Sequence, residues 1–491
     1  MRKTALVAAL ALAATLTVTP LRGQMAQQGA PSTAGMVIKG KAPVSNEILK
    51  VKLPKPQMAT LANGLQLMVL EDHRLPRVSF QILIPGAGGY YDPAPMIGLS
   101  SYTAQMMREG TKSKSSQQIS QELETMAANV NVGSSTSGTT ATVSGGALAE
   151  NLDRLFDLAA DVLLNPTFSA EEWDRLKTRA RAALVQQRTQ PGFLSQERFS
   201  KVLFGDHPAG RVSATPETLD AITRDAMVEW HRTKFLPDHA LIAFAGDITL
   251  ADARKLADTK LAAWKKSGAP KPAVTDPSPA GAAKVYLDAR PSSVQTSLTV
   301  GGQSMVRTDP DFIPLTVANR VLGGTMGRLF RHLREEKGYT YGVGSGFTAT
   351  QYRGSWSAST NVRTDVTDPA LADLMAEIES MRTTAVPDKE LNDAKRAIVA
   401  GFALSLETPE QMLGYYVQNW LYNLPADYWD TYPAKISAVT AAQAQAAAAK
   451  YWDPARLQIV AVGDATKITE VMKKRGTLEV YDADGKPTKG S

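Results

Sequence analysis

Apolar and polar residues alternate with two different periods along this chain, and these periods predict helices and strands in a similar order in both halves. In the first half, residues 58–61 and 65–70 flank the turn dipeptide Asn63-Gly64 and predict a β-hairpin. Further strands are predicted at 77–84, 130–132, 139–143 and 240–245. Helical periodicity predicts helices at 97–108, 117–128, 148–164, 170–188, 225–234 and 250–265.

The second half repeats this order. Strands are predicted at 284–287, at 297–300, around 341–348 and at 354–360, and helices at 312–322 and from Pro369, Asp388, Pro409 and Thr440. We therefore predict an α+β fold, with two homologous α/β sandwich domains in tandem. Each domain is a mixed sheet packed by helices, and we expect a clam-shell arrangement of the two.

A constant offset supports a duplication. Pro237 and Pro454 are 217 positions apart (454 − 237 = 217), and the same offset joins Gly246 to Gly463, Asp247 to Asp464, Thr223 to Thr440 and Asp92-Pro93 to Asp309-Pro310. A period this long is far outside the range of about 20 to 50 residues typical of solenoid repeats. The duplicated unit is therefore a whole domain, and we expect the functional surface to involve both halves.

The N-terminal residues predict export. Arg2-Lys3 precede an apolar run from Ala5 to Leu16, the pattern of a secretory signal, and the run is too short and Ala-rich to predict a membrane span. An apolar helix of a cytoplasmic protein is the weaker alternative. The expected domains are a signal peptide (1–24), a flexible arm (25–54), an N-terminal domain (55–266), a linker with four prolines (267–283), a C-terminal domain (284–475) and a polar tail that frays (476–491). The predicted location is the periplasm.

Composition excludes several kinds of chemistry. The chain has no cysteine, which excludes disulfides, thiolate catalysis and thiolate metal sites. Its net charge of +6 comes from 54 Lys and Arg against 48 Asp and Glu, without long like-charge blocks, so we expect no nucleic-acid partner.

The first long helix of the first half carries a recognisable motif. The segment from Gly98 to Thr111, GLSSYTAQMMREGT, resembles the active-site helix of the pitrilysin and insulinase metallopeptidases, the inverzincins. Those enzymes carry His-x-x-Glu-His there, two zinc ligands and a glutamate that activates water. The corresponding positions here are Ser101, Ala104 and Gln105, so all three functional side chains are missing.

The resemblance places the family's third zinc ligand, a glutamate, in the stretch from Lys177 to Gln190, which has no acidic residue. None of the five histidines, His73, His207, His231, His239 and His332, is spaced i, i+4 from another. Zinc needs several converging N, O or S ligands. We therefore expect this chain to bind no metal itself, and we expect His207 to shape a loop.

A second motif lies in the other half. The segment from Leu333 to Val343, LREEKGYTYGV, resembles the family's C-terminal signature. The resemblance implies that Arg334 and Tyr341 hold the substrate backbone and support the oxyanion at a zinc site. A charged donor fork and a phenol both suit that role. The alternative is structural: Arg334 pairs with Glu335, Glu336 or another acid, and Tyr341 caps a core.

Glycines cluster beside this motif, at Gly323-Gly324 and from Gly342 to Gly346. They lack the spacing of a phosphate-binding loop. We expect them to allow close backbone approach or a bulge, which would help an extended peptide add as a strand.

Three functions are compatible with these motifs. The preferred hypothesis is a non-catalytic subunit of a heteromeric zinc metallopeptidase that binds peptide substrates. A partner chain with an intact His-x-x-Glu-His motif would supply the zinc. A structural or peptide-binding scaffold is the alternative from another class. A peptidase that works alone through unrecognised ligands is the third, and one tightly held zinc per chain would support it.

Overall fold

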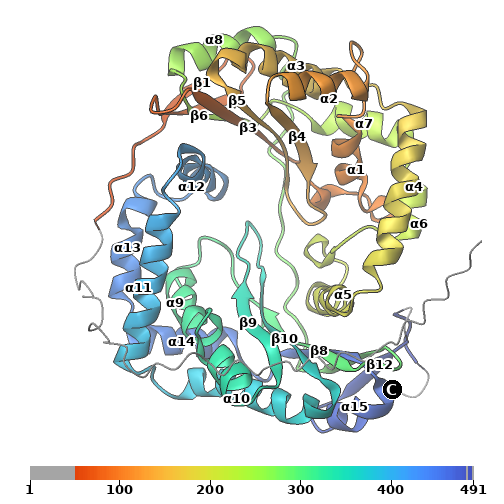
Figure 1. The fold of residues 1–491 in the computed structure, drawn as a ribbon, viewed down its shortest axis with the longest axis vertical. Helices are drawn as coiled ribbons and strands as arrows, with labels where there is room; N and C mark the ends of the chain where they lie inside the picture. Colours follow the sequence, from red (N-terminus) through yellow and green to blue (C-terminus); the bar gives the residue numbers. More distant parts are fainter. Residues whose placement is uncertain (1–49, 483–484, 489–491) are drawn as a thin grey trace, which may run out of the picture. The chain divides into compact units, whose positions relative to one another are not determined.

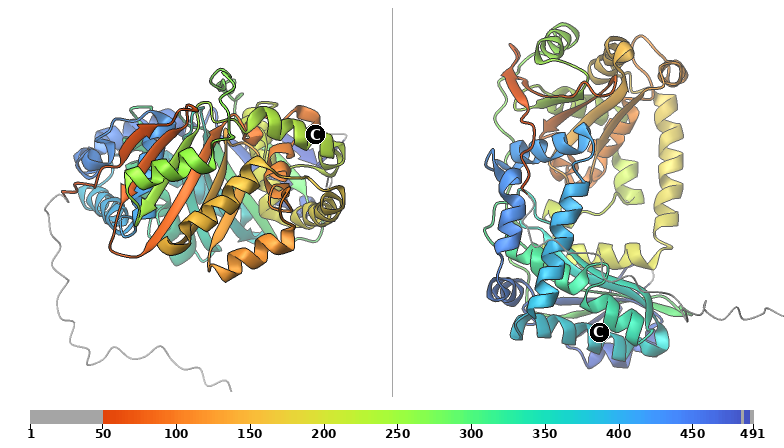
Figure 2. Two further views of the ribbon diagram at one scale, coloured as in Figure 1. Left: turned by 90° about the horizontal axis from the view of Figure 1, so that it is seen from above. Right: turned by 60° about the vertical axis from the view of Figure 1, so that its left-hand side comes forward.

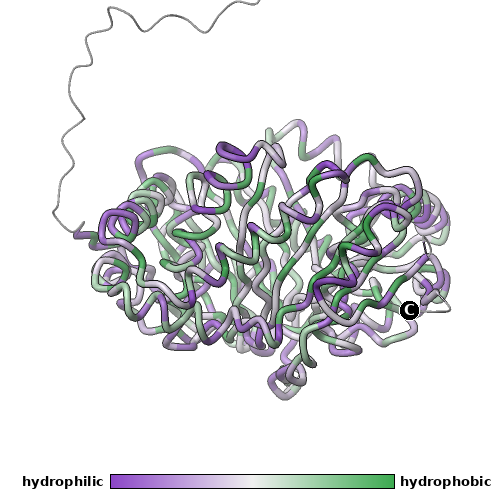
Figure 3. The backbone as a smooth tube through the Cα atoms, turned by 90° about the horizontal axis from the view of Figure 1, so that it is seen from below, coloured by the Kyte–Doolittle hydropathy of each residue, from purple (hydrophilic) through white to green (hydrophobic). Residues whose placement is uncertain are grey.

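The computed structural model describes residues 50–482 and 485–488, so the predicted signal peptide and most of the predicted arm lie outside the described residues. Each half contains a six-stranded mixed sheet covered by helices, which confirms the predicted α+β fold with two homologous domains (Figure 1). Figure 3 shows green, apolar stretches along strands and helix faces, with purple, polar stretches in the outer turns.

The first sheet has the order β1-β2-β6-β3-β5-β4. Its strands are β1 (Gln57–Thr60), β2 (Gln66–Glu71), β3 (Arg77–Pro85), β4 (Asn129–Ser134), β5 (Thr140–Leu148) and β6 (Leu241–Gly246). Only β2 and β6 pair in parallel. The predicted hairpin is confirmed: β1 and β2 pair antiparallel, and Gly64 in the turn has a φ of 86°, a conformation that glycine adopts without strain.

The second sheet has the order β12-β7-β11-β8-β10-β9. Its strands are β7 (Val285–Ala289), β8 (Gln295–Gln303), β9 (Thr340–Phe347), β10 (Ser355–Arg363), β11 (Gln458–Gly463) and β12 (Leu478–Tyr481). The series β7-β11-β8-β10-β9 matches β2-β6-β3-β5-β4 of the first sheet in chain order and direction. Only the strand at the other edge differs. In the first sheet it is β1, which comes before the repeated strands in the chain; in the second it is β12, which comes after them.

The helices flank these sheets. In the first half they are α1 (Leu99–Met106), α2 (Ser116–Thr125), α3 (Leu152–Leu164), α4 (Ala170–Gln187), α5 (Pro191–Phe204), α6 (Pro216–Ala221), α7 (Arg224–Lys234) and α8 (Leu250–Lys260). In the second half they are α9 (Phe312–Gly323), α10 (Thr367–Thr383), α11 (Asp388–Leu404), α12 (Pro409–Tyr422), α13 (Tyr428–Ala438), α14 (Ala441–Tyr451) and α15 (Ala465–Lys473). Short 3₁₀ turns occupy Gly89–Tyr91, Ala94–Met96, Ala149–Asn151, Pro208–Gly210 and Thr364–Val366, and Phe330–Glu336 forms a π-helical turn.

The repeat also extends to helix caps. The side chain of Thr223 accepts a hydrogen bond at the start of α7, and the side chain of Thr440, 217 positions later, does so at the start of α14. Such caps satisfy backbone N–H groups that have no partner inside the helix. The recurring threonine in the sequence therefore marks the same helix start twice.

Each half lends one helix to the sheet of the other half. Helix α5 packs against β8 and β11 of the second sheet, whereas α12 packs against β2 and β6 of the first (Figures 1 and 2). The pleat explains how one strand serves two cores, because successive side chains point to opposite faces. In β2, Leu67 and Val69 join the core of the first half, while Met68 and Leu70 join a core shared with α12 and the rest of the second half.

The two chain ends differ from expectation. Of the predicted flexible arm, residues 50–54 are described, and Leu53 is buried against the second half, where its N–H donates to Asp430 Oδ1 at 3.1 Å. The prediction of a frayed tail is wrong for Leu478–Tyr481, which form β12 beside β7. This strand has only four residues, too few for an alternating pattern to predict a strand with certainty, and all four are half-buried.

Candidate functional site

The π-helical turn Phe330–Glu336 and strand β9 position the predicted pair Arg334 and Tyr341. Leu333 is fully buried and anchors the turn in the second core. Gly338 then takes a φ of 61°, which suits glycine, and the chain passes directly into β9. Single π-turns are frequent at functional sites because they re-aim side chains within a helix.

The structure brings Arg334 and Tyr341 together. The guanidinium carbon of Arg334 lies 5.1 Å from the ring centroid of Tyr341 and 4.6 Å from that of Phe330, within cation–π range. Arg334 Nε also lies 3.6 Å from Glu335 Oε1, so the ion pair of the structural alternative is present. Tyr341, however, caps no core, because it is 90% exposed. Its phenol is available to another molecule.

The glycines beside this pair behave in two ways. A Cβ added at Gly342 or Gly346 would meet nothing within 4 Å, so the expected close approach is wrong at these positions. At Gly323 it is correct, because a Cβ there would lie 2.0 Å from Ser345 Oγ. The β9–β10 ladder also contains an irregularity between Thr360 and Val362, as a bulge would produce. Strand β9 ends its sheet, so one of its edges is free in the described chain.

Helix α1, which carries the motif of the first half, begins at a buried cap. The carboxylate of Asp92 accepts hydrogen bonds from the N–H groups of Gly98 at 2.7 Å and Ser100 at 2.9 Å. Burial raises the pKa of Asp92 to about 6, although these hydrogen bonds and the charge of Arg211 act in the opposite direction. The cap fixes the start of α1 and so the direction of the three motif positions.

Those motif positions hold structural side chains. Ser101 Oγ donates to the carbonyl of Ser134 on β4 at 2.8 Å, and Gln105 Nε2 donates to the carbonyl of Ser101 at 3.3 Å. Ala104 is fully buried. No side chain at these positions can activate a water molecule or provide an imidazole ligand.

A cavity of about 410 Å³ lies between α1 and α4 beside these residues. Ser101 and Gln105 line it from α1, and Arg179 and Gln187 line it from α4, within the stretch where the resemblance placed a glutamate ligand. Hydroxyls, amides and one guanidinium are a poor donor set for zinc, and the positive charge of Arg179 would repel the ion. Across residues 50–482 and 485–488, no group of three His, Asp or Glu side chains could hold a metal ion. The residues present do not fit a zinc centre.

The histidines have other roles. Each contacts a hydrogen-bonding partner: Asp247 for His73, Thr275 for His207, Leu163 for His231, Ala269 for His239 and Glu377 for His332. His207 Nδ1 also accepts the N–H of Ala209 and caps the turn Pro208–Gly210, which confirms that it shapes a loop. Hydrogen bonding to Asp247 raises the pKa of His73, and burial lowers that of His231.

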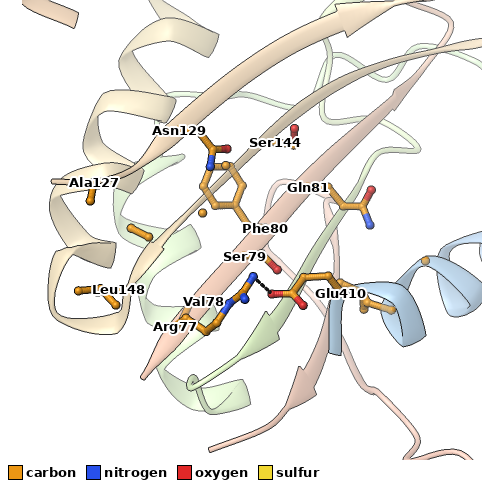
Figure 4. Close-up of a pocket in the computed structure, with 15 residues that line it drawn as sticks. Arg77, Val78, Ser79, Phe80, Gln81, Ala127, Asn129, Ser144, Leu148 and Glu410 are labelled. Atoms are coloured by element: carbon orange, nitrogen blue, oxygen red, sulfur yellow. Dashed lines mark ion pairs between the residues drawn. The ribbon is translucent and has the colours of Figure 1, made fainter. Parts of the chain in front are cut away.

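Two grooves escaped the sequence analysis, and both follow from the exchanged helices. One, of about 810 Å³, lies where α12 crosses β3 and β5; there Arg77 and Glu410 point toward each other and form an ion pair at 2.8 Å (Figure 4). The other, of about 770 Å³, lies where α5 crosses β8, β9 and β10. Pro191 and Pro409, 218 positions apart, begin α5 and α12 (409 − 191 = 218). This recurring proline in the sequence could have indicated that α5 and α12 are equivalent helices of the two halves.

The second groove is uncharged. It is lined by Ser, Thr, Asn and Gln side chains, two phenylalanines, one valine and the glycines of α5 and β9. Gly342, next to Tyr341, is part of the lining, so the groove adjoins the Arg334/Tyr341 pair. Neutral hydroxyls and bare backbone suit the amide groups of an extended peptide.

Comparison with known families gives this arrangement its context. The profile of the insulinase family (peptidase family M16) matches residues 67–217, and that of the peptidase M16 inactive domain matches residues 221–398. These two ranges together cover most of the described chain; the first lies within the first half, and the second begins near the end of the first half and extends through much of the second. The chain belongs to peptidase family M16, and its first half lacks the side chains that bind zinc and activate water in that family.

Individual relatives agree with this assignment. The chain is 23% identical over 354 residues to the uncharacterized zinc protease YmxG of Bacillus subtilis, covering 71% of this chain and 84% of that protein. It is 24% identical over 367 residues to the non-peptidase homolog YmxG of Helicobacter pylori, covering 74% and 83%.

Among solved structures, a peptidase M16 inactive domain from Pseudomonas fluorescens is similar, with a TM-score of 0.78 and 27% identity over 84% of this chain and 98% of that one. A protease from Helicobacter pylori shares the fold, with a TM-score of 0.77 and 15% identity over 84% and 100%. None of the helices in the described part of the chain is long and apolar enough to cross a membrane.

Proposed function

We propose that this chain is the non-catalytic subunit of a heteromeric zinc metallopeptidase. A partner chain with an intact His-x-x-Glu-His helix supplies the zinc and the activated water. This chain contributes Arg334 and Tyr341, which help to bind the peptide and stabilise the tetrahedral intermediate in the partner's site. The observation that carries the proposal is the contact between an arginine and a 90% exposed tyrosine on a free sheet edge, in a chain whose own motif helix cannot bind zinc.

The chemistry of the pair supports this role. When water attacks an amide, negative charge develops on the carbonyl oxygen, and donors already aimed at that position stabilise the transition state more than the substrate. The guanidinium of Arg334 lies against two aromatic rings, Phe330 and Tyr341. Tyr341 supplies an O–H donor beside it.

The neighbouring surface supports peptide binding. The outer edge of β9 pairs with no further strand of the described chain, and a peptide in extended conformation can add to such an edge as a further strand. Gly342 and Gly346 carry no side chain to obstruct its approach, and the uncharged groove beneath α5 lies next to this edge.

The proposed location is the periplasm. It rests on the leader pattern of Arg2-Lys3 and the apolar run from Ala5 to Leu16, which lie outside the described residues. The absence of cysteine from the chain is compatible with an oxidising compartment, because the chain has no thiol that could be oxidised there.

The test uses the full chain and a family member from the same genome that carries an intact His-x-x-Glu-His motif. Cleavage of internally quenched peptides is followed with each protein alone and with the mixture. This chain alone should be inactive and the mixture active. Replacing Arg334 by Ala or Tyr341 by Phe should lower turnover of the mixture by about 10²- to 10³-fold, roughly 2.7–4 kcal/mol, the usual effect of removing an oxyanion donor.

Arg331→Ala is the matched control. Arg331 lies on the same π-turn but pairs with Glu390 at 2.7 Å, so its loss should leave turnover near that of the unchanged mixture. Size-exclusion chromatography must show that each variant still forms the complex. Normal turnover with both Arg334→Ala and Tyr341→Phe would remove the oxyanion role.

A scaffold function is the alternative, and one observation favours it: a relative from Helicobacter pylori is described as a non-peptidase homolog. A scaffold should be recovered from cell extracts with proteins other than a zinc peptidase, and the Arg334 and Tyr341 variants should bind those proteins normally. Recovery with a zinc peptidase, and loss of its activity in the variants, would exclude this alternative.

A further inference from the structure

The cavity between α1 and α4 is positively charged, whereas a metal site built from carboxylates would be negatively charged. Among the residues that line it, only Arg179 is charged, and it lies in the stretch where the family resemblance placed a glutamate. The remaining polar groups are hydroxyls and amides. A cavity of about 410 Å³ is within the usual size of small-ligand sites, which is roughly 300–1,000 Å³. Its charge favours an anion.

Arg179 is available to such an anion. Its partner is weak: Nη2 forms a long ion pair with Glu109 Oε1 at 3.9 Å, beyond hydrogen-bond distance, and the other oxygen of Glu109 accepts from Ser116 Oγ at 3.0 Å. Within the described residues, Arg179 donates no side-chain hydrogen bond, and its side chain is 61% exposed. Other arginines of α4 are engaged: Arg175 pairs with Glu171 and Glu172 on the same helix, and Arg181 pairs with Asp220.

The cavity also has an apolar part. Leu176 and Leu184, which lie on α4 on either side of Arg179, are buried residues that line it. Gln105 is exposed and Gln187 is half-buried; both line the cavity, and their amides can donate to or accept from a peptide group. A ligand that matches both parts carries a carboxylate, an amide and an apolar side chain.

We propose that this cavity binds the C-terminal end of a short peptide whose last residue is apolar. Arg179 pairs with the terminal carboxylate, for which its planar guanidinium can provide two parallel N–H donors. The last side chain packs against Leu176, one turn from Arg179 on α4, and the amide of Gln105 contacts the preceding peptide group. In this proposal, the place where catalytic family members hold zinc binds the C-terminus of a peptide in this chain. The inference does not depend on the proposed oxyanion role.

Isothermal titration calorimetry tests it on the full chain with three probes: acetyl-Ala-Ala-Leu with a free carboxylate, the same peptide as its C-terminal amide, and free leucine. We expect the free acid to bind at one site per chain and the amide to bind about tenfold more weakly or worse, because the charge-assisted pair is lost. Arg179→Gln should weaken binding of the free acid by a similar factor and leave binding of the amide unchanged.

Arg175→Gln is the control, since Arg175 lies one turn away and outside the cavity; it should bind like the unchanged protein. Both arginines are exposed, and equal melting temperatures check that the variants fold. Equal affinities for acid and amide, or full binding by Arg179→Gln, would overturn the proposal. So would stoichiometric zinc binding that Ser101 or Gln105 variants abolish. Leucine binding as tightly as the tripeptide would reject a peptide as the ligand.

Discussion

Arg198 joins the two halves, and replacing it by Ala should strongly destabilise the protein. It lies on α5 of the first half, where its Nε donates to Asp288 Oδ1 on β7 at 3.0 Å and to Oδ2 at 3.4 Å. Its guanidinium carbon is 3.3 Å from the ring centroid of Tyr481 on β12. The side chains of Arg198 and Asp288 are only 13% and 8% exposed, so solvent screens the pair weakly.

The expected loss of stability in Arg198→Ala follows from the unpaired Asp288 that remains. Without Arg198, the carboxylate of Asp288 stays buried and loses the donors to both oxygens. Breaking a buried pair in this way typically costs about 3–5 kcal/mol, because the remaining charge has no compensation. The double variant Arg198→Met with Asp288→Leu removes both charges and should recover most of that loss, since apolar replacement of a buried pair is often neutral.

Urea unfolding followed by tryptophan fluorescence measures the effect. A lower urea midpoint with an unchanged m-value reports a loss of stability. Arg175→Ala is the control: its pair with Glu171 is exposed, and such helix pairs contribute only about 0.3–0.5 kcal/mol. A loss with Arg198→Ala no larger than the loss with Arg175→Ala would refute the reasoning. A double variant as unstable as the single one would refute the part that concerns the unpaired carboxylate.

The pH dependence gives a second check. Burial raises the pKa of Asp288 above its ordinary value, and Arg198 acts against this effect. In Arg198→Ala the pKa rises further, so the folded state binds a proton at a pH where the unfolded state has released it. Stability of the variant then falls as pH rises through the folded pKa. The deficit relative to the unchanged protein should be smaller at about pH 5 than at about pH 8.

Two further variants probe other contacts. Gly323→Ala places a Cβ 2.0 Å from Ser345 Oγ, so we expect a loss of about 1–3 kcal/mol in urea unfolding, whereas Gly342→Ala, with open space around it, should change stability by less than about 0.5 kcal/mol. Equal effects would contradict the close packing of α9 on β9. Arg77→Ala breaks a partly exposed pair with Glu410 and should cost no more than about 1 kcal/mol; a larger loss would show that this pair, like that of Arg198, holds the halves together.

Sequence patterns predicted most elements but not the exchange of α5 and α12. Helix α12 was expected from Pro409, whereas α5 was missed, although Pro191 begins it in the same way. An amphipathic pattern shows that a helix has a buried face, but it does not show which sheet covers that face. The unbroken burial of β6 and β11 has the same origin, because their second faces are covered by a helix from the other half.

The candidate site was predictable in part. The family resemblance selected Arg334 and Tyr341, and their contact depends on a π-turn and on Gly338, which the local pattern did not reveal. The availability of Arg179 was also hidden, because it depends on the distance to Glu109, which is close to Arg179 only in the folded chain. Contacts between distant segments decide such features, and periodicity reports only on neighbours along the chain.

The reciprocal placement of α5 and α12 also bears on the origin of the molecule. A chain of half this length with the same layout would project one helix with no sheet of its own to cover. It would also have one bare sheet face. Two such chains could complete each other by swapping helices about a twofold axis, which gives a closed dimer with no surface left for further growth. Fusion of the two genes would convert that dimer into a single polypeptide and free each copy to diverge.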